Sequence, residues 1–211
     1  MGSCARCERL RHAELPGFRR GPMHTGMPAL RGEWTTAMVD ALPDSSERYE
    51  LVDGTLLVTP SPSERHQALI VELLRRIDPY VRGHRVGHTL CSPSDVQRAD
   101  PGRNRLQPDV FVVRASTMPK PFRTNGLLLA IEVVSPGSAI IDYQRKREIY
   151  IGDGVPEYWV LNAEARNLSR WSTLEQPGEV LSDRMQWNPA GAPVPLVIDL
   201  NELFDDAAWA E

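Results

Sequence analysis

The sequence predicts a single α/β domain with a mixed central β-sheet flanked by helices. Two near-continuous apolar runs, Asp109–Val113 and Leu127–Val134, are typical of strands that are covered on both faces. Before them, apolar residues recur at the spacing of one helix face: Leu69, Ile70, Leu73, Leu74, Ile77 and Tyr80. The chain has 211 residues, 41% apolar and 25% charged, which excludes fibrous and broadly disordered classes. The longest strongly apolar run is far too short to span a bilayer, so we expect no membrane partner.

Residues 1–32 are predicted to be a flexible N-terminal extension, and residues 33–211 to form the single domain. The first segment is rich in Gly, Pro and Arg and shows no apolar periodicity. It holds six Arg against two Glu, whereas the remainder holds 18 basic and 26 acidic residues. The predicted domain is therefore acidic. Met23 and Met27 are further candidates for the first residue of the protein.

No continuous apolar segment near the N-terminus looks like a secretion signal, so we expect a cytoplasmic protein whose three cysteines are thiols. Cys4 and Cys7, with His12 and His24, suggest zinc. The histidine spacing, however, fits no common zinc finger, and there is no second Cys pair. Cys91 is more typical of a buried small apolar residue than of a nucleophile.

A β-hairpin followed by a long helix is predicted between residues 49 and 81. Tyr49–Val52 and Thr55–Val58 are β-prone runs around Asp53-Gly54, the strongest short signal of a hairpin. In Ser61-Pro62-Ser63-Glu64 the first serine is predicted to be the N-cap, with the proline as the first helical residue. The helix is predicted to end near Val81.

The remaining elements follow from the same signals. In order, we predict a strand at Arg85–Leu90, an exposed polar loop at Arg98–Arg105, a helix at Ser138–Ile151, a strand at Glu157–Leu161, and short strands with a brief terminal helix through Trp171, Trp187 and Pro195–Leu200.

Two carboxylates stand in the predicted central strands. Asp109 follows Pro108 at the start of the first strand, and Glu132 lies deep in the second. An ionised carboxylate in an apolar strand must be paired, bind a metal ion, or become neutral through a raised pKa. A salt bridge or a protonated acid in the core is therefore the structural alternative to a catalytic site.

Lys146 is a further candidate site residue. At 100° per residue it lies at the edge of the core-facing stripe of its predicted helix, one turn after Asp142. That stripe is formed by Ala139, Tyr143 and Tyr150. The chain has 22 Arg and only two Lys, so background usage does not account for this lysine. An ammonium can be tuned for proton transfer, whereas an ordinary helix pair with Asp142 would contribute about 0.3 to 0.5 kcal/mol.

An ordered series of motifs resembles a known group of nucleases. Pro108-Asp109, Glu132-Val133-Val134 and Lys146 resemble the PD-(D/E)XK nuclease superfamily with its lysine moved from a strand to a helix. More closely, roughly residues 34–206 resemble the Uma-two family of predicted bacterial restriction endonucleases. The matching segments are Tyr49-Glu-Leu-Val-Asp-Gly54, Pro60-Ser-Pro62 with His66, Gln107-Pro-Asp-Val-Phe-Val112, Ile131-Glu-Val-Val-Ser-Pro136, Asp142 with Lys146, and Gly154-Val-Pro-Glu-Tyr-Trp159.

The resemblance implies a restriction-endonuclease-like core and cleavage of DNA that depends on Mg²⁺, or on Mn²⁺ in its place. It implies that Asp109, Glu132 and the backbone carbonyl of Val133 hold the metal ion. Lys146 would then orient or deprotonate the attacking water and balance negative charge. DNA is the expected partner, and residues 33–211 would form the endonuclease-like domain.

Three further positions bear on this candidate site. Glu50 resembles the extra acidic metal ligand of such sites, with a surface strand charge as the alternative. His66 could take part in catalysis, although a histidine on a helix surface is the commoner outcome. Val134 stands where the simplest superfamily pattern has Lys. Strand alternation places it on the face of Glu132, where a small side chain leaves room for Lys146.

A basic segment lies within the acidic domain. Residues 75–123 hold ten basic residues against four Asp. This excess favours a phosphate-facing surface, while a solvated Arg-rich face is the structural alternative. Arg98, Arg103 and Arg105 are candidates for phosphate contacts from their loop, or simply keep it solvated.

Two functions other than catalysis remain open. The protein could be a catalytically degenerate nuclease fold that binds nucleic acid or protein partners. It could also be a homodimeric scaffold assembled through Tyr158, Trp159 and Trp171, because aromatic residues are enriched at interfaces as well as in cores. Metal binding that disappears in Asp109→Ala would favour the enzyme.

Overall fold

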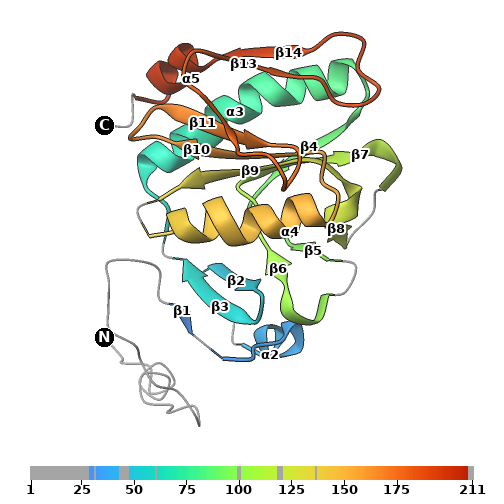
Figure 1. The fold of residues 1–211 in the computed structure, drawn as a ribbon, viewed down its shortest axis with the longest axis vertical. Helices are drawn as coiled ribbons and strands as arrows, with labels where there is room; N and C mark the ends of the chain where they lie inside the picture. The colour runs from blue at the N-terminus through green and yellow to red at the C-terminus, as the bar shows by residue number, and fades with distance from the viewer. Residues whose placement is uncertain are drawn as a thin grey trace, which may run out of the picture.

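The computed structural model describes residues 29–30, 32–42, 48–59, 61–98, 101–117, 121–135 and 137–208. Figure 1 shows two β-sheets, with most of the helical residues packed around the upper one. Cys4, Cys7, His12 and His24, whose spacing fits no common zinc finger, lie outside the described residues. Within the described part of the chain, no helix combines the length and the apolar composition that a membrane crossing requires.

The larger sheet confirms the predicted mixed sheet. Its six strands lie in the order β12-β11-β10-β9-β7-β4. Strand β9 pairs in parallel with β10 and antiparallel with β7, so the two predicted central strands are neighbours inside the sheet. The strands are β4 (Gly87–Cys91), β7 (Val110–Arg114), β9 (Leu127–Val134), β10 (Glu157–Asn162), β11 (Asn167–Trp171) and β12 (Glu179–Leu181).

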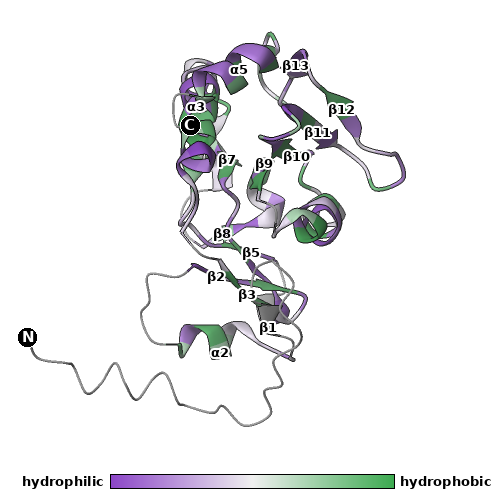
Figure 2. Ribbon diagram, turned by 90° about the vertical axis from the view of Figure 1, so that its left-hand side faces the viewer, coloured by the Kyte–Doolittle hydropathy of each residue, from purple (hydrophilic) through white to green (hydrophobic). Residues whose placement is uncertain are grey.

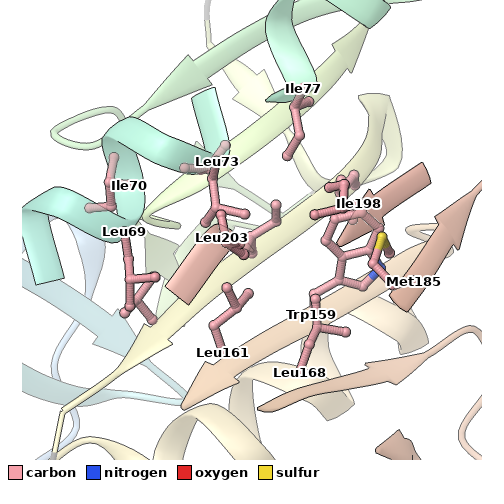
Figure 3. Packing of buried hydrophobic residues seen from close by; sticks show 14 of the residues in the cluster. Leu69, Ile70, Leu73, Ile77, Trp159, Leu161, Leu168, Met185, Ile198 and Leu203 are labelled. Atoms are coloured by element: carbon pink, nitrogen blue, oxygen red, sulfur yellow. The ribbon is translucent and has the colours of Figure 1, made fainter. Parts of the chain in front are cut away.

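Helices cover both faces of this sheet, which confirms the α/β class (Figures 1 and 2). One face carries α3 (Glu64–Gly83), α5 (Leu200–Asp206) and the hairpin of β13 (Arg184–Trp187) and β14 (Leu196–Asp199), and the other carries the π-helix η4 (Ile141–Lys146) and α4 (Arg147–Gly152). In Figure 3, Leu69, Leu73 and Ile77 of α3 face Trp159 and Leu161 of β10. These apolar contacts hold the long helix against the central strands.

The second face of the sheet has its own apolar cluster, which includes Ala130, Tyr150 and Tyr158. Tyr158 and Trp159 are 0% exposed and Trp171 is 8% exposed. The prediction that these three aromatic residues form an assembly surface is therefore wrong, because they pack inside the monomer.

A second sheet, which the sequence did not predict, lies below the first in Figure 1. Its strand order is β1-β3-β2-β6-β5-β8. The predicted hairpin is confirmed as β2 and β3, joined by Asp53 and Gly54, whose positive φ angles of 48° and 78° fit the turn. The elements of this layer are β1 (Ala29–Leu30), α2 (Thr36–Asp40), β2 (Arg48–Val52), β3 (Thr55–Thr59), β5 (Val96–Gln97), β6 (Arg105–Leu106) and β8 (Phe122–Arg123).

Two sequence predictions are corrected by this sheet. Residues 29–30 fall inside the predicted extension of residues 1–32 but form β1, which satisfies backbone groups along the edge of β3. The stretch 98–105 is only partly an exposed loop. Asn104 is 5% exposed because its side-chain oxygen accepts a hydrogen bond of 2.9 Å from the Asp53 N–H.

Two helices also differ from prediction. Helix α3 has Ser63, not Ser61, as its N-cap, because the Ser63 hydroxyl oxygen accepts a hydrogen bond from the His66 N–H. The helix predicted at Ser138–Ile151 is α-helical at Ala139 and Ile140, π-helical over Ile141–Lys146 and α-helical again over Arg147–Gly152. The described residues also include three short 3₁₀ turns: η1 (Pro101–Arg103), η2 (Ala115–Thr117) and η3 (Thr124–Gly126).

Candidate active site

A cavity of about 710 Å³ opens where β7 begins and β9 ends. Its wall combines residues of both sheets with the start of α3, the segment after β4 and the π-helix η4. All five predicted site side chains line it, together with one that was not predicted: Glu50, His66, Asp109, Glu132, Lys146 and Arg48. The fold therefore brings together residues that are distant in the sequence, such as Glu50 and Lys146, which lie 96 positions apart.

The sheet register places Asp109 beside the Glu132-Val133 peptide. In the antiparallel β7–β9 pair, Val110 lies opposite Ile131, so the next pair along the ladder is Asp109 and Glu132. Asp109 Oδ2 accepts a hydrogen bond of 2.8 Å from the Val133 N–H. Val134 packs with the cluster on the η4 and α4 side, which is the face predicted for it.

We call Glu50, Glu132, Asp142 and Lys146 the lysine cluster. Lys146 Nζ lies 3.0 Å from Oε1 of Glu50, 3.0 Å from Oε1 of Glu132 and 3.4 Å from Oδ1 of Asp142. None of the four side chains is more than 3% exposed. Because Asp142 and Lys146 both belong to η4, the π-helix turns both inward, whereas a regular helix would leave Lys146 at the edge of the buried face.

We call Arg48, His66 and Asp109 the arginine cluster. Asp109 Oδ1 accepts a hydrogen bond of 3.0 Å from Arg48 Nη1 and lies 3.3 Å from His66 Nε2. Arg48 Nη2 also donates to Glu50 Oε2 at 3.2 Å. The guanidinium of Arg48 therefore links the two clusters.

The two central carboxylates have opposite pKa shifts. Burial alone would raise the pKa of Asp109, but contact with His66, the positive charge of Arg48 and the Val133 N–H lower that pKa from 3.8 to about 2. Burial raises the pKa of Glu132 well above its usual range, and the lowering effect of Lys146 does not cancel it. Burial also raises the pKa of Asp142.

Lys146 is held in its charged form. Burial alone would lower its pKa, but the carboxylates of Glu132, Glu50 and Asp142 outweigh burial and raise the pKa well above its usual range. An ammonium group donates hydrogen bonds and has no lone pair to accept a proton. This charge state fits the predicted orienting role of Lys146 and does not fit removal of a proton from water.

Sequence reasoning missed two members of this arrangement. Arg48 was not considered, although it stands two residues before Glu50 on one strand and so shares its face. Asp142 was considered only as an ordinary helix partner of Lys146. The carboxylate of Asp142 is instead buried in the lysine cluster.

The arginines of the 98–105 stretch do not face the cavity. Arg98 binds Asp153, Arg103 binds the backbone oxygen of Asp53, and Arg105 binds Asp40 and Asp95. Acidic or backbone groups of the chain hold each guanidinium, and phosphate contacts of these three arginines stay a prediction.

The donor set of the cavity fits a divalent cation. Mg²⁺ prefers carboxylate and carbonyl oxygens, which Glu50, Asp109, Glu132 and the Val133 backbone provide. Among the described residues, no group of three or more His, Cys, Asp or Glu side chains has the spacing of a ready metal site, and Lys146 lies between the acids. Glu132 Oε1 nevertheless has no hydrogen-bond partner among the described residues, since its contact with Lys146 lacks hydrogen-bond geometry. A buried carboxylate oxygen in this condition suits a cation.

Comparisons with known proteins agree with this fold. No curated protein matches the chain. A crystal structure from Anabaena variabilis, described as a putative nuclease belonging to DUF820, has a TM-score of 0.69 and 19% sequence identity. The match covers 82% of this chain and 99% of that one, so the two proteins share a fold. The model of the Uma2 family, described as "Putative restriction endonuclease", matches residues 37–200, and the chain belongs to that family.

Proposed function

We propose that this protein is a metal-dependent endonuclease that hydrolyses phosphodiester bonds in DNA. The observation that carries the proposal is the lysine cluster, in which one buried ammonium contacts three buried carboxylates at the wall of an open cavity. Buried charges with perturbed pKa values concentrate at functional sites. Membership of a family described as restriction endonucleases supports a nuclease rather than another hydrolase.

Asp109, Glu132 and Glu50, with the backbone carbonyl of Val133, would hold Mg²⁺ or Mn²⁺. The bound ion would supply charge that stabilises the phosphate oxygens and lowers the pKa of a bound water. The formal charges of the two clusters support the binding of a divalent cation. They contain four carboxylates, from Glu50, Asp109, Glu132 and Asp142, against the permanent positive charges of Arg48 and Lys146.

Lys146 orients the attacking water and balances charge that develops on the phosphate. Its ammonium donates a hydrogen bond of 3.2 Å to Glu50 Oε2 and forms ion pairs with Glu132 and Asp142, so the group needs little reorganisation during the reaction. His66 is a positioning residue in this scheme, because Nε2 fixes the direction of Asp109 Oδ1.

The test is a plasmid nicking and cleavage assay with Mg²⁺ and Mn²⁺, with single-stranded DNA as a second substrate. We expect wild type to cleave only with metal and Asp109→Ala to be inactive. Asp78→Ala is the matched control, since this carboxylate pairs with Arg82 on α3 away from the cavity. Wild type that binds DNA without cleaving it, with the same affinity in Asp109→Ala, would favour the binding module instead.

Sedimentation of the same preparation checks the predicted homodimer.

A further inference from the structure

Arg48 is the most exposed charged side chain of the two clusters. Its side chain is 22% exposed, compared with 14% for His66 and 2% for Asp109 and Lys146. Arg48 also lines the cavity directly. The charge of Lys146 is enclosed by acids, so the guanidinium of Arg48 is the cluster cation best placed to meet an anion that enters from solvent.

The acid oxygens that Arg48 holds are the ones a cation would need. Oδ2 of Asp109 accepts a hydrogen bond from the Val133 N–H, and Oδ1 is in contact with both Arg48 and His66. In the same way, Oε1 of Glu50 accepts the Gln107 N–H at 2.8 Å, while Oε2 accepts from both Arg48 and Lys146 at 3.2 Å. A divalent cation that binds Asp109 and Glu50 through these oxygens therefore competes with the guanidinium.

We propose that Arg48 is a substrate-binding residue that exchanges partners: it holds Asp109 and Glu50 until a divalent cation enters, and then contacts a phosphate of the nucleic acid. This inference rests on the proposed nuclease function. It adds Arg48 as a specific phosphate ligand and an order of events, in which the cation displaces Arg48 from the acids before Arg48 binds the nucleic acid strand.

Electrostatics and side-chain chemistry both favour the exchange. A divalent cation beside Asp109 repels the nearby guanidinium and neutralises the acids that hold it. The planar fork of arginine then matches two phosphate oxygens, which a point charge such as lysine does not. Arg48 is also incompletely anchored, because its buried Nε has no hydrogen-bond partner among the described residues. Its contact with Ser92 Oγ, at 3.4 Å, is long.

The first measurement is calorimetric titration with Mn²⁺ of wild type, Arg48→Ala and Arg48→Lys, together with the rise in Tm that Mn²⁺ causes. Removal of the competing guanidinium should tighten Mn²⁺ binding about tenfold in Arg48→Ala and enlarge its metal-induced rise in Tm. Arg48→Lys, which reaches one carboxylate at a time, should have an Mn²⁺ affinity between those of wild type and Arg48→Ala. It also replaces Arg48→Ala in the test if that variant does not fold. Arg82→Ala, an exposed α3 arginine, should match wild type. Unchanged or weaker Mn²⁺ binding in the Arg48 variants would overturn the exchange.

The second measurement is the salt dependence of DNA affinity, with Ca²⁺ in place of Mg²⁺ because both use oxygen ligands. Loss of one phosphate contact should weaken binding in Arg48→Ala and reduce the slope of log K against log salt by about one, with Arg48→Lys retaining most of the slope. An unchanged slope in Arg48→Ala would overturn phosphate binding by Arg48. Wild type that takes up neither Mn²⁺ nor DNA would contradict the proposed function itself, whereas normal uptake with unaffected Arg48 variants would contradict the exchange alone.

Discussion

The arginine cluster and the lysine cluster share one cavity and contain equally buried carboxylates, but their charge balance is opposite. Asp109 and Glu132 are each 1% exposed. Asp109 has three partners, namely His66, Arg48 and the Val133 N–H, of which only Arg48 also binds another acid of the two clusters, and its pKa falls to about 2. Glu132 shares a single ammonium with two other acids, and its pKa rises.

This difference shows that burial alone does not decide the charge of a carboxylate. The number of donors per acid decides whether the desolvation cost is offset. In the arginine cluster the hydrogen bonds and charges around Asp109 offset its desolvation cost, so Asp109 stabilises the junction of β2, β7 and α3. In the lysine cluster three acids share one cation, so this is the part of the cavity that gains most from a positive charge supplied by solution.

The largest expected effect is that of Lys146→Ala, which removes the ammonium in contact with Glu132. Three buried acids then lack their shared partner, and we expect a loss of about 3 to 5 kcal/mol in unfolding free energy without metal. Turnover should fall about 10² to 10³-fold if the protein is an endonuclease. Urea denaturation and plasmid cleavage measure the two effects, with the exposed Arg145→Ala on the same π-helix as control. Wild-type stability and turnover in Lys146→Ala would make Lys146 an ordinary helix residue.

A smaller loss is expected for Asp109→Asn, which keeps the shape but removes the charge that Arg48 and His66 stabilise. The pKa of Asp109 is lowered by about two units, which corresponds to about 2 kcal/mol of folding free energy at neutral pH. Because the folded pKa is below the unfolded value, this contribution is complete above pH 3.8 and disappears as the pH falls towards 2. Denaturation curves of wild type and Asp109→Asn should therefore differ at pH 7 and converge towards pH 2. Equal stability of wild type and Asp109→Asn at pH 7 would show that the charge of Asp109 does not stabilise the arginine cluster.

The smallest effect on stability is expected for Glu132→Gln. Burial raises the pKa of Glu132 above 4.5, so the ionised carboxylate destabilises the fold as the pH rises from 4.5 through the folded pKa. The uncharged glutamine should thus preserve or raise the Tm at pH 7 to 8 without metal, and any gain should shrink as the pH falls towards 4.5. Cleavage should nevertheless be lost. A drop in Tm as large as that of Asp109→Asn would remove the distinction between the clusters.

The sequence contains enough information to locate the acids of the site but not their partners. Asp109 and Glu132 stand out because the first begins an apolar run and the second interrupts one, and apolar continuity also identifies β7 and β9. Nothing local distinguishes the two acids from each other. The lowered pKa of Asp109 depends on His66 and on Arg48, which lies 61 positions from Asp109 and reaches it from the second sheet.

The unpredicted features of the fold have a similar origin. Strands β5, β6 and β8 have two residues each, too few to show any periodicity, so the second sheet is set by long-range pairing. The inward direction of Asp142 and Lys146 depends on the π-helix η4. Residue spacing assumes 3.6 residues per turn and does not reveal such a segment.

The most direct test of a cation-binding cavity is anomalous diffraction from crystals of the wild-type protein soaked in Mn²⁺. We predict a peak in the cavity with oxygens of Asp109 and Glu132 as ligands, and with the guanidinium of Arg48 turned away from Asp109 Oδ1. A cavity without Mn²⁺ at saturating concentration, with the Arg48–Asp109 pair intact, would contradict the account.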